Sequence, residues 1–599
     1  MTSEMTPETR PAAAPSPSRR DPTPVTFEGL FGWLHPAAGR RGVVLCGAYG
    51  FEQMAAYRPW RALAERLAGA GCPTLRFDYP GEGDSTDPDA TGVAACVAAI
   101  RHAVRFLRET AGVTEIVLVG LRLGAAFAAL AAEAEPVDRL VLLAPVTTGR
   151  AYLREMRLRA QTIGRLPDGS APPADPEALT VGGFRMDAAF QAELSALNLA
   201  RIATAPLAGV LLLATDPGAL ATRFSTLGCA VETGPFAGLP HLVGDPIFVT
   251  VPEADFARIA AFAVEGAAAA EAAATVPPPA SLAGPGWTEA PVRIAPGLFG
   301  IGCAPQRPEP GAPTLLFVST GMTVRSGWGR QTTRLARSLA AEGVASFRFD
   351  VAGVGDSVDR PDGSRPLFAP DGFADVIRAV DHAAGGGPIV LVGGCSGAYA
   401  AFHALCRDPR IDGALLVNLY CFDWDPEQSV DSVIRQTYGS AATYAALLKQ
   451  GDTWRRLIRG QIRVRAIGGV LARRGLDAAL RRLRRALRPG PPGGSVTRRV
   501  AAIRRRGAAL RLLYSAGDPG LGALRRQLGR DADRVTRRLG APVTIVPGAD
   551  HNLGSVDAQA ALGLAVRDLL RAVRRAPAVQ AKRPAPTVSG WLQAVTGRA

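Results

Sequence analysis

The sequence LVGGCSGAYA occupies residues 391–400, between an apolar run and a segment with helical periodicity. The apolar run is typical of a buried parallel strand. A strand that turns into a helix within a few residues needs small residues around the turn, and Gly394 and Gly397 lie near Ser396. The stretch therefore predicts a nucleophile elbow that presents the hydroxyl of Ser396, with Ala398 where the usual pattern has its last glycine.

The length and composition of the chain limit the possible architectures. A chain of 599 residues exceeds what one hydrophobic core holds, so we expect two domains of about 250 residues each. The composition, 47% hydrophobic and 20% charged, is that of a globular protein, and no apolar run is long enough to span a membrane. The polar N-terminus lacks a secretory signal, and the eight cysteines lack paired close spacings. We predict a cytoplasmic protein with reduced thiols.

A repeated phrase divides the chain into two halves. The pattern FD-x-x-G-x-GDS occurs at residues 77–85 and again at 349–357, an offset of 272 residues. In each half an apolar strand and a helix precede the phrase, and a helix, a strand and an elbow follow it. A repeat of this length indicates duplicated domains rather than a solenoid.

Proline- and glycine-rich stretches mark the predicted domain boundaries. Between the elbow and the next acidic position each domain carries an insertion, which we expect to form a cap over the pocket. The predicted division is a disordered tail at 1–24, an N-terminal domain at 25–275, a Pro/Gly linker at 276–290, a C-terminal domain at 291–576 with its cap at about 420–507, and a disordered tail at 577–599.

The net charge of +15 is concentrated in the cap of the C-terminal domain. Residues 451–511 contain 18 arginines and two aspartates, and four leucines between 476 and 487 recur at helical spacing. This pattern predicts an amphipathic basic helix. Three interpretations stay open: a solvated face, a dock for an acidic carrier protein, or attachment to an anionic membrane surface. Nucleic acid is not an expected partner, since Trp454 is the segment's one aromatic residue.

An acid and a histidine follow later strands of the C-terminal half. The order Ser396, Asp518, His551 is that of a catalytic triad in an α/β protein with a mostly parallel sheet. His551 would take the proton of the Ser396 hydroxyl, and Asp518 would orient the imidazole. Asp423 and Asp425 remain alternatives for the acid, because a triad acid is recognised by geometry and not by position.

Two backbone N–H groups are predicted to form an oxyanion hole in the C-terminal half. One belongs to Gly397, and the other belongs to Met322 in the loop after the third strand, at residues 320–322. We interpret Cys395 as a small packed side chain beneath the elbow rather than as a nucleophile. No metal site and no cofactor are predicted.

The N-terminal half departs from this pattern at its elbow. Arg122 stands at the nucleophile position, with Asp216 and His241 at the positions of the acid and the base. A guanidinium stays protonated and cannot act as a nucleophile, so we predict that this half is catalytically inactive. We favour a buried ion pair between Arg122 and an aspartate such as Asp216 over an anion site at the helix start.

Taken together, these motifs resemble a tandem of α/β-hydrolases of the serine aminopeptidase-like group. The N-terminal half, with GLRLGA at 120–125 and APVTTGRAYLR at 144–154, is similar to hydrolases associated with bacterial exosortase systems and exopolysaccharide loci. The C-terminal half, with GCSGAY at 394–399, keeps the catalytic pattern. The resemblance implies two α/β-hydrolase domains, each a mostly parallel sheet with flanking helices and a helical cap, and a role near exopolysaccharide biosynthesis.

The predicted function is that of a bacterial serine hydrolase, esterase- or thioesterase-like, acting on a small-molecule acyl ester or thioester through an acyl-enzyme at Ser396. An acyltransferase that uses the same triad is one alternative. A scaffold or binding protein in which both sites are inert is another. The expected location is cytoplasmic, with peripheral attachment to the inner membrane if the basic cap binds lipid.

Overall fold

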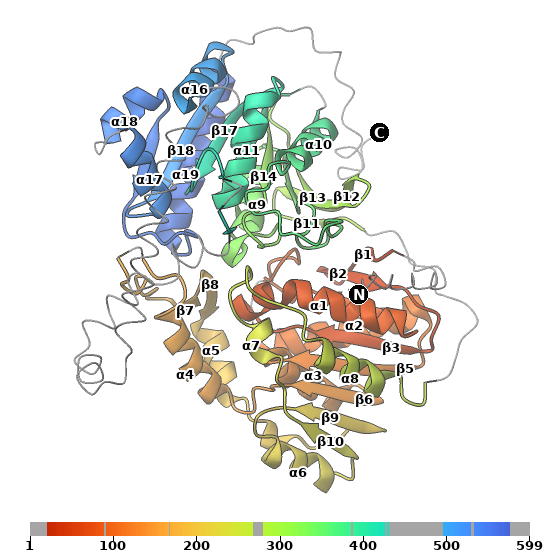
Figure 1. Cartoon of the computed structure of the whole chain (residues 1–599). Helices are drawn as coiled ribbons and strands as arrows, with labels where there is room; N and C mark the ends of the chain where they lie inside the picture. Colours follow the sequence, from red (N-terminus) through yellow and green to blue (C-terminus); the bar gives the residue numbers. More distant parts are fainter. Residues whose placement is uncertain are drawn as a thin grey trace, which may run out of the picture.

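The computed structural model describes residues 21–88, 92–166, 168–267, 280–384, 387–425, 428–430, 495–528 and 532–575. These residues form two α/β domains, each with its own large sheet (Figure 1). The predicted basic helix around 476–487 lies outside the described residues. Among the helices that the structure describes, none combines the length and the apolar character needed to cross a membrane.

The sheet of the N-terminal domain has eight strands. They are β1 (Thr23–Phe27), β2 (Leu30–His35), β3 (Arg41–Cys46), β4 (Thr74–Phe77), β5 (Glu115–Leu121), β6 (Arg139–Leu143), β9 (Gly209–Leu213) and β10 (Val231–Gly234). Their order is β1-β2-β4-β3-β5-β6-β9-β10, and all pairs from β4 onward are parallel. Parallel strands are buried on both faces, which explains the continuous apolar runs in this part of the sequence.

Helices cover both faces of this sheet. They are α1 (Phe51–Gly69), α2 (Val93–Ala111), α3 (Leu123–Ala134), α6 (Gly218–Thr226), α7 (Leu239–Leu242) and α8 (Glu253–Val264). Helices α2 and α3 share one hydrophobic core with the sheet, and α1 and α8 share the other. The predicted cap lies between β6 and β9 and consists of α4 (Gly149–Ala160), β7 (Ala178–Val181), β8 (Phe184–Asp187) and α5 (Ala188–Ala196).

The sheet of the C-terminal domain repeats this plan with nine strands. They are β11 (Leu282–Gly284), β12 (Trp287–Ala295), β13 (Leu298–Pro305), β14 (Thr314–Val318), β15 (Ser346–Phe349), β16 (Ile389–Gly394), β17 (Ile411–Val417), β18 (Ala509–Ser515) and β19 (Val543–Val546). The order β13-β15-β14-β16-β17-β18-β19 matches β2-β4-β3-β5-β6-β9-β10 of the other sheet. The predicted duplication and the α/β class are confirmed.

The described helices of the C-terminal domain occupy the equivalent places. They are α9 (Gln331–Ala341), α10 (Phe373–Ala383), α11 (Cys395–Arg407), α16 (Val496–Arg505), α17 (Pro519–Leu528), α18 (Ala532–Leu539) and α19 (Val556–Arg575), with a short 3-10 turn η2 (Trp328–Arg330). Helices α10 and α11 pack on one face of the sheet, and α9 and α19 pack on the other.

The linker expected at 276–290 needs a correction. Strand β11 and the first residues of β12 fall within that range and pair with each other in an antiparallel hairpin. Gly286, with a φ of 81°, forms the tight turn between them. The glycines that suggested a linker therefore serve a turn between two strands.

The repeated phrase lies at the interface between the two domains. Arg348 precedes the second copy and lies 2.9 Å from Asp84 of the first copy. Reciprocally, Arg76 precedes the first copy and pairs with Asp356 of the second copy. Arg325 joins both aspartates, at 2.6 Å from Asp84 and 2.8 Å from Asp356. All five side chains are buried, so these ion pairs fasten one domain to the other.

Candidate active site

Strand β16 turns directly into helix α11 at Cys395, which occupies the elbow in place of Ser396. The φ of Cys395 is 47°, the left-handed conformation of a residue at a sharp strand-to-helix turn. A Cβ on Gly393 would lie 2.5 Å from the carbonyl oxygen of Gly397, and a Cβ on Gly397 would lie 2.6 Å from that of Ser319. Both glycines are therefore required, and the pattern is G-x-C-x-G. The elbow position that was predicted for Ser396 is therefore occupied by Cys395, one residue earlier.

The elbow of the N-terminal domain confirms this register. Arg122 follows β5, precedes α3 and has a φ of 55°. Gly120 and Gly124 flank it, and a Cβ on Gly124 would lie 1.9 Å from the carbonyl oxygen of Gly47. The two elbows have the same glycine spacing, and Arg122 corresponds to Cys395, whereas Ser396 corresponds to Leu123.

The acid and the base predicted from the sequence come together at the C-terminal elbow. The Nδ1 of His551 lies 2.7 Å from Oδ2 of Asp518. The other carboxylate oxygen of Asp518 accepts the backbone N–H of Gly520 at 2.8 Å, and Asp518 is almost fully buried. The side chain of His551 also forms a hydrogen bond with Cys395. Because Nδ1 is held by Asp518, Nε2 is the atom left for the thiol, and the three side chains form the series Asp518, His551, Cys395.

The environment of His551 favours its protonated form. Burial lowers the pKa of His551, but the charges of Asp518 and Cys395 and the hydrogen bonds to both raise it, and the net pKa lies well above 6.5. An imidazolium beside a cysteine stabilises the thiolate, which is the nucleophilic form of that side chain. The imidazole of His551, whose pKa is raised, and the side chain of Cys395 are therefore neighbours at the elbow.

The alternative acid Asp423 is engaged elsewhere. Nη2 of Arg499 donates to Oδ2 of Asp423 at 2.5 Å, and the guanidinium of Arg499 lies over the ring of Phe402, 5.1 Å from its centroid. The partner of His551 Nδ1 is Asp518, and neither Asp423 nor Asp425 takes that place. Arg499 belongs to the arginine-rich segment, and it is packed into the domain rather than solvated.

Two side chains that the sequence analysis missed hold the histidine loop. Nδ2 of Asn418 donates to the carbonyl oxygen of His551 at 2.7 Å and to Oγ of Ser515 at 3.0 Å. The hydroxyl of Ser515 donates in turn to the carbonyl oxygen of Asp550 at 2.7 Å. These bonds tie the loop to the ends of β17 and β18. A signal was present in the sequence, because Asn418 is a polar residue directly after the apolar run that forms β17.

Ser396 has a different role from the one predicted. Its hydroxyl is buried and accepts the backbone N–H of Gly321 at 2.9 Å, which ties the start of α11 to the loop after β14. The residue after an elbow nucleophile supplies one oxyanion donor, and in this register its N–H is that of Ser396 instead of Gly397. The side chain of Met322, in the same loop, packs against the C-terminal core. A donor from Met322 stays a prediction.

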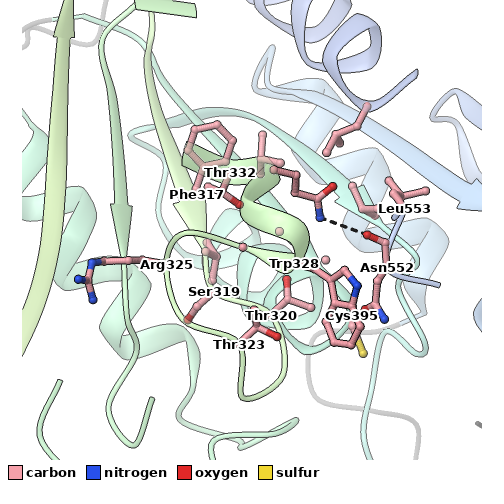
Figure 2. A pocket seen from close by; sticks show the side chains of 18 of the residues that line it. Phe317, Ser319, Thr320, Thr323, Arg325, Trp328, Thr332, Cys395, Asn552 and Leu553 are labelled. Carbon is pink, nitrogen blue, oxygen red and sulfur yellow. Dashed lines mark hydrogen bonds between the residues drawn. The ribbon is translucent and has the colours of Figure 1, made fainter. Parts of the chain in front are cut away.

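A cavity of about 80 Å³ adjoins the elbow (Figure 2). Its lining combines polar groups with apolar walls: Thr320, Gln331, Cys395, His551 and Asn552 on one hand, and Phe317, Trp328, Leu335 and Leu562 on the other. The amide of Gln331 donates to the carbonyl oxygen of Asn552 at 3.2 Å, the dashed line in Figure 2. The described residues include no group of three or more His, Cys, Asp or Glu side chains placed to hold a metal ion.

Arg122 is a buried arginine in an ion pair, but its partners are two glutamates. Its Nε lies 3.0 Å from Oε1 of Glu52, and its Nη2 lies 2.6 Å from Oε2 of Glu155. Burial lowers the pKa of Arg122, but Glu52 and Glu155 raise it above its ordinary value, so the guanidinium stays charged. The structure thus corrects the partner that we expected, Asp216.

The other two residues of the degenerate site do not join Arg122. Asp216 is exposed, and its Oδ1 accepts the N–H of Gly218 at 3.3 Å. His241 is also exposed, and its Nδ1 lies 3.0 Å from the hydroxyl of Thr250. The N-terminal domain therefore keeps the backbone of an elbow without an assembled triad.

Two family models match the two domains of the chain. Residues 310–563 match the model of the α/β-hydrolase family, and residues 43–179 match the model of the α/β-hydrolase fold. No curated protein matches the chain.

Three solved structures with a similar fold serve as examples. A proline iminopeptidase-related protein from Thermus thermophilus is 21% identical, and the match covers 48% of this chain and 99% of that one with a TM-score of 0.28. The esterase Est1E from Butyrivibrio proteoclasticus, with bound ferulic acid, is 17% identical over 41% of this chain and 98% of its own, with a TM-score of 0.30. A putative lipase from Acinetobacter baumannii AYE is 15% identical, and the match covers 48% of this chain and 92% of that one with a TM-score of 0.30.

Proposed function

The chain is a tandem of two α/β-hydrolase domains, and from this premise we propose that its C-terminal domain is a cysteine-dependent hydrolase of an ester or thioester. One observation carries the proposal: Cys395, at a positive φ in a G-x-C-x-G elbow, shares a hydrogen bond with a histidine that is itself bonded to Asp518. This is the arrangement in which a thiolate is formed, oriented and supplied with an acid.

In the first step the thiolate of Cys395 attacks the carbonyl carbon of the substrate. The negative charge that develops on the carbonyl oxygen is stabilised by the N–H of Ser396 and by a donor from the loop after β14. The tetrahedral intermediate then breaks its bond to the leaving group, which takes the proton from Nε2 of His551. The products of this step are a thioester at Cys395 and a free alcohol or thiol.

In the second step water releases the acyl group. Neutral His551 takes a proton from the water, and the hydroxide attacks the thioester carbonyl. The bond to sulfur breaks, the thiolate is restored beside the imidazolium, and the carboxylic acid leaves. The sum is ester or thioester plus water to acid plus alcohol or thiol. Esters and thioesters are proposed ahead of amides, because nitrogen resonance makes an amide carbonyl the least electrophilic of the three.

The N-terminal domain is proposed to be catalytically inactive. A charged guanidinium stands at its elbow, and the pair with Glu52 and Glu155 fills the place that a nucleophile and its base would need. The similarity of this half to hydrolases of exopolysaccharide loci makes a sugar-linked acyl ester a reasonable first substrate to assay.

Two other functions make different predictions for the same protein. An acyltransferase would use the same residues but would release acid slowly until a hydroxyl acceptor is added. A scaffold or binding protein would release no product with or without an acceptor, and loss of the Cys395 thiol would change nothing.

Substitution of the two neighbouring residues tests the proposal. Cys395→Ala should reduce kcat/KM for short nitrophenyl and thioester substrates by about 10³-fold or more, because no nucleophile remains. Ser396→Ala keeps the thiolate and its N–H donor, so we expect a loss of about tenfold or less from the weakened loop contact. Steady-state rates of both purified variants provide the measurement.

Folding of the variants is checked by thermal melting, and retention of product release without an acceptor separates hydrolysis from acyl transfer. The proposal is wrong if Ser396→Ala abolishes activity while Cys395→Ala keeps it.

A further inference from the structure

A loop of the N-terminal domain reaches the active site of the C-terminal domain. The loop follows α7 and includes residues 244–250. The carbonyl oxygen of Ile247 accepts Nη1 of Arg365 at 2.8 Å, and this bond crosses from one domain to the other. Ile247 and Phe248 both pack against the hydrophobic core that contains α10 and α11. The loop is thus fixed on the C-terminal domain.

Ile247 lies over Gly321, in the loop that is predicted to supply the second oxyanion donor. A Cβ built on Gly321 would lie 3.9 Å from Cδ1 of Ile247, and, its chain neighbours aside, Ile247 is the one described residue near that position. The N–H of Gly321 donates to the hydroxyl of Ser396, the residue after Cys395. Ile247 therefore lies one residue layer from the elbow.

Asp245 lies in the same loop, two residues before Ile247. The charges of Asp245 and His551 act on each other across the domain boundary. The carboxylate of Asp245 is held in place by the N–H of Ile247, which donates to Oδ1 at 2.9 Å. The loop therefore contacts the oxyanion loop through Ile247 and carries a carboxylate whose charge acts on His551.

The cap of the N-terminal domain contacts the histidine loop as well. A Cβ on Gly183, in the turn of the β7–β8 hairpin, would lie 3.1 Å from the carbonyl oxygen of Gly554. A Cβ on Gly164 would lie 3.4 Å from Oδ2 of Asp550, the neighbour of His551. Figure 1 shows the hairpin beside the C-terminal domain. Two separate segments of the inactive domain thus adjoin the working site.

We propose that the N-terminal domain completes the active site of the C-terminal domain: Ile247 is a wall beside the Gly321 loop that limits the acyl group, and the carboxylate of Asp245 adds a negative charge near the site. This inference rests on the proposed function of Cys395 and names what the inactive domain does for it. The same loop follows His241, the remnant of the N-terminal site, so a histidine turn that lost its own triad now serves the site of its duplicate.

Charged groups of both domains act on His551. Asp245 is one from the N-terminal domain. The described charged and titratable groups are Asp518 from the turn before α17, Cys395 from the elbow, Asp550 from the histidine loop and Asp245. Asp518 accepts the hydrogen bond from Nδ1 of His551, and its charge is the largest of those that raise the pKa of His551. Asp245 is exposed, so water screens its charge and its effect is smaller.

The first experiment measures alkylation of Cys395 by iodoacetamide against pH, which needs no substrate. Asp245→Asn removes one negative charge near the imidazolium, so the inflection that reports His551 should move down by about half a pH unit. Asp245→Glu should restore the wild-type profile. Asp216→Asn, an exposed aspartate of the same domain, is the matched control and should leave the profile unchanged.

The second experiment measures kcat/KM for nitrophenyl esters of increasing acyl length. Ile247→Ala opens the wall, so the ratio for hexanoate over acetate should rise about three- to tenfold. Leu207→Ala, at a leucine that is 78% exposed on the same domain, is the control.

The outcomes separate the two proposals. If Cys395→Ala is inactive while Asp245→Asn matches Asp216→Asn and Ile247→Ala matches Leu207→Ala, the N-terminal loop plays no part in the site and this inference is overturned. If Cys395→Ala hydrolyses esters like the wild type, the proposed function is overturned, and the alkylation profile still decides whether Asp245 acts on His551.

Discussion

The two elbows of this chain share a backbone and differ in one side chain. Arg122 and Cys395 have φ values of 55° and 47°, and each is flanked by glycines two positions away on both sides. The residues that follow the next strands, Ala144 and Asn418, also share positive φ values of 41° and 46°. The positive φ at the elbow is therefore the same whether the residue there is an arginine or a cysteine.

The surroundings of the two elbows differ more than their backbones. At the C-terminal elbow, Asn418 ties the histidine loop to the sheet, whereas Ala144 has no group that could do so. At the N-terminal elbow, the carboxylate of Glu52 from α1 replaces an imidazole as the partner of the elbow side chain. In this chain, an acid and a histidine meet at the elbow of the domain whose histidine loop is anchored to the sheet.

The largest effect should come from breaking the contact that holds the two domains together. Arg325 lies within 2.8 Å of three aspartates, Asp84, Asp350 and Asp356, and its side chain is 1% exposed. Arg325→Ala leaves these carboxylates without their shared cation, so the free energy of unfolding should fall by about 3–5 kcal/mol. Denaturant unfolding of the whole chain provides the measurement.

An exposed ion pair of the N-terminal domain serves as the control for Arg325. Arg258 and Glu232 lie 2.6 Å apart, but their side chains are 35% and 52% exposed. Arg258→Ala should cost about 0–1 kcal/mol. Equal losses from the two variants would contradict the role of the buried contact.

The next effect concerns the acid of the triad. Asp518→Asn should lower kcat/KM about ten- to hundredfold, because the imidazole loses its orientation and its stabilising charge. The pKa of His551 is raised mainly by Asp518 against burial, so the imidazolium persists above pH 6.5 in the wild type. Removing the charge lowers this pKa, and the alkaline limb of kcat/KM for an alkyl ester should move to lower pH. A limb that stays in place would contradict the assignment of Asp518.

The sequence predicted the fold and the duplication, because strand and helix periodicities and the order of motifs are local properties. It also singled out Asp518 and His551, which the structure brings together. It placed the elbow one position too late, since a serine beside a cysteine was preferred on its chemistry, whereas Cys395 has the positive φ at the turn. The spacing of Gly393 and Gly397, four residues as in Gly120 and Gly124, contained the correct register.

The remaining contacts depend on tertiary geometry. Glu52 and Glu155 lie 70 and 33 residues from Arg122, on two different helices, and no periodicity links them to the elbow. The reciprocal pairs of Arg76 and Arg348 with the repeated aspartates require the two domains to face each other. A sequence pattern shows that the phrase is duplicated but not that its copies meet.

The smallest effect should follow from Arg122→Ala. Glu52 is buried and loses its main partner, but Arg159 remains 3.5 Å from it, so the free energy of unfolding should fall by only about 1–2 kcal/mol. Hydrolysis should stay within twofold of wild type, since Cys395 is untouched. Thermal melting and ester hydrolysis measure the two effects.

A variant of the same position sharpens the comparison. Arg122→Cys copies the C-terminal elbow residue into the N-terminal frame, and in a Cys395→Ala background it should not restore hydrolysis, because neither Asp216 nor His241 is anchored there. Recovery of activity would contradict the view that the loops decide.

Trapping of the acyl-enzyme tests the central claim most directly. The protein is quenched in acid during turnover of a slow ester, digested, and the peptide containing residues 395 and 396 is fragmented by mass spectrometry. We predict an acyl group on Cys395 that neutral hydroxylamine removes, as expected of a thioester. An acyl group on Ser396 that resists hydroxylamine would contradict the account.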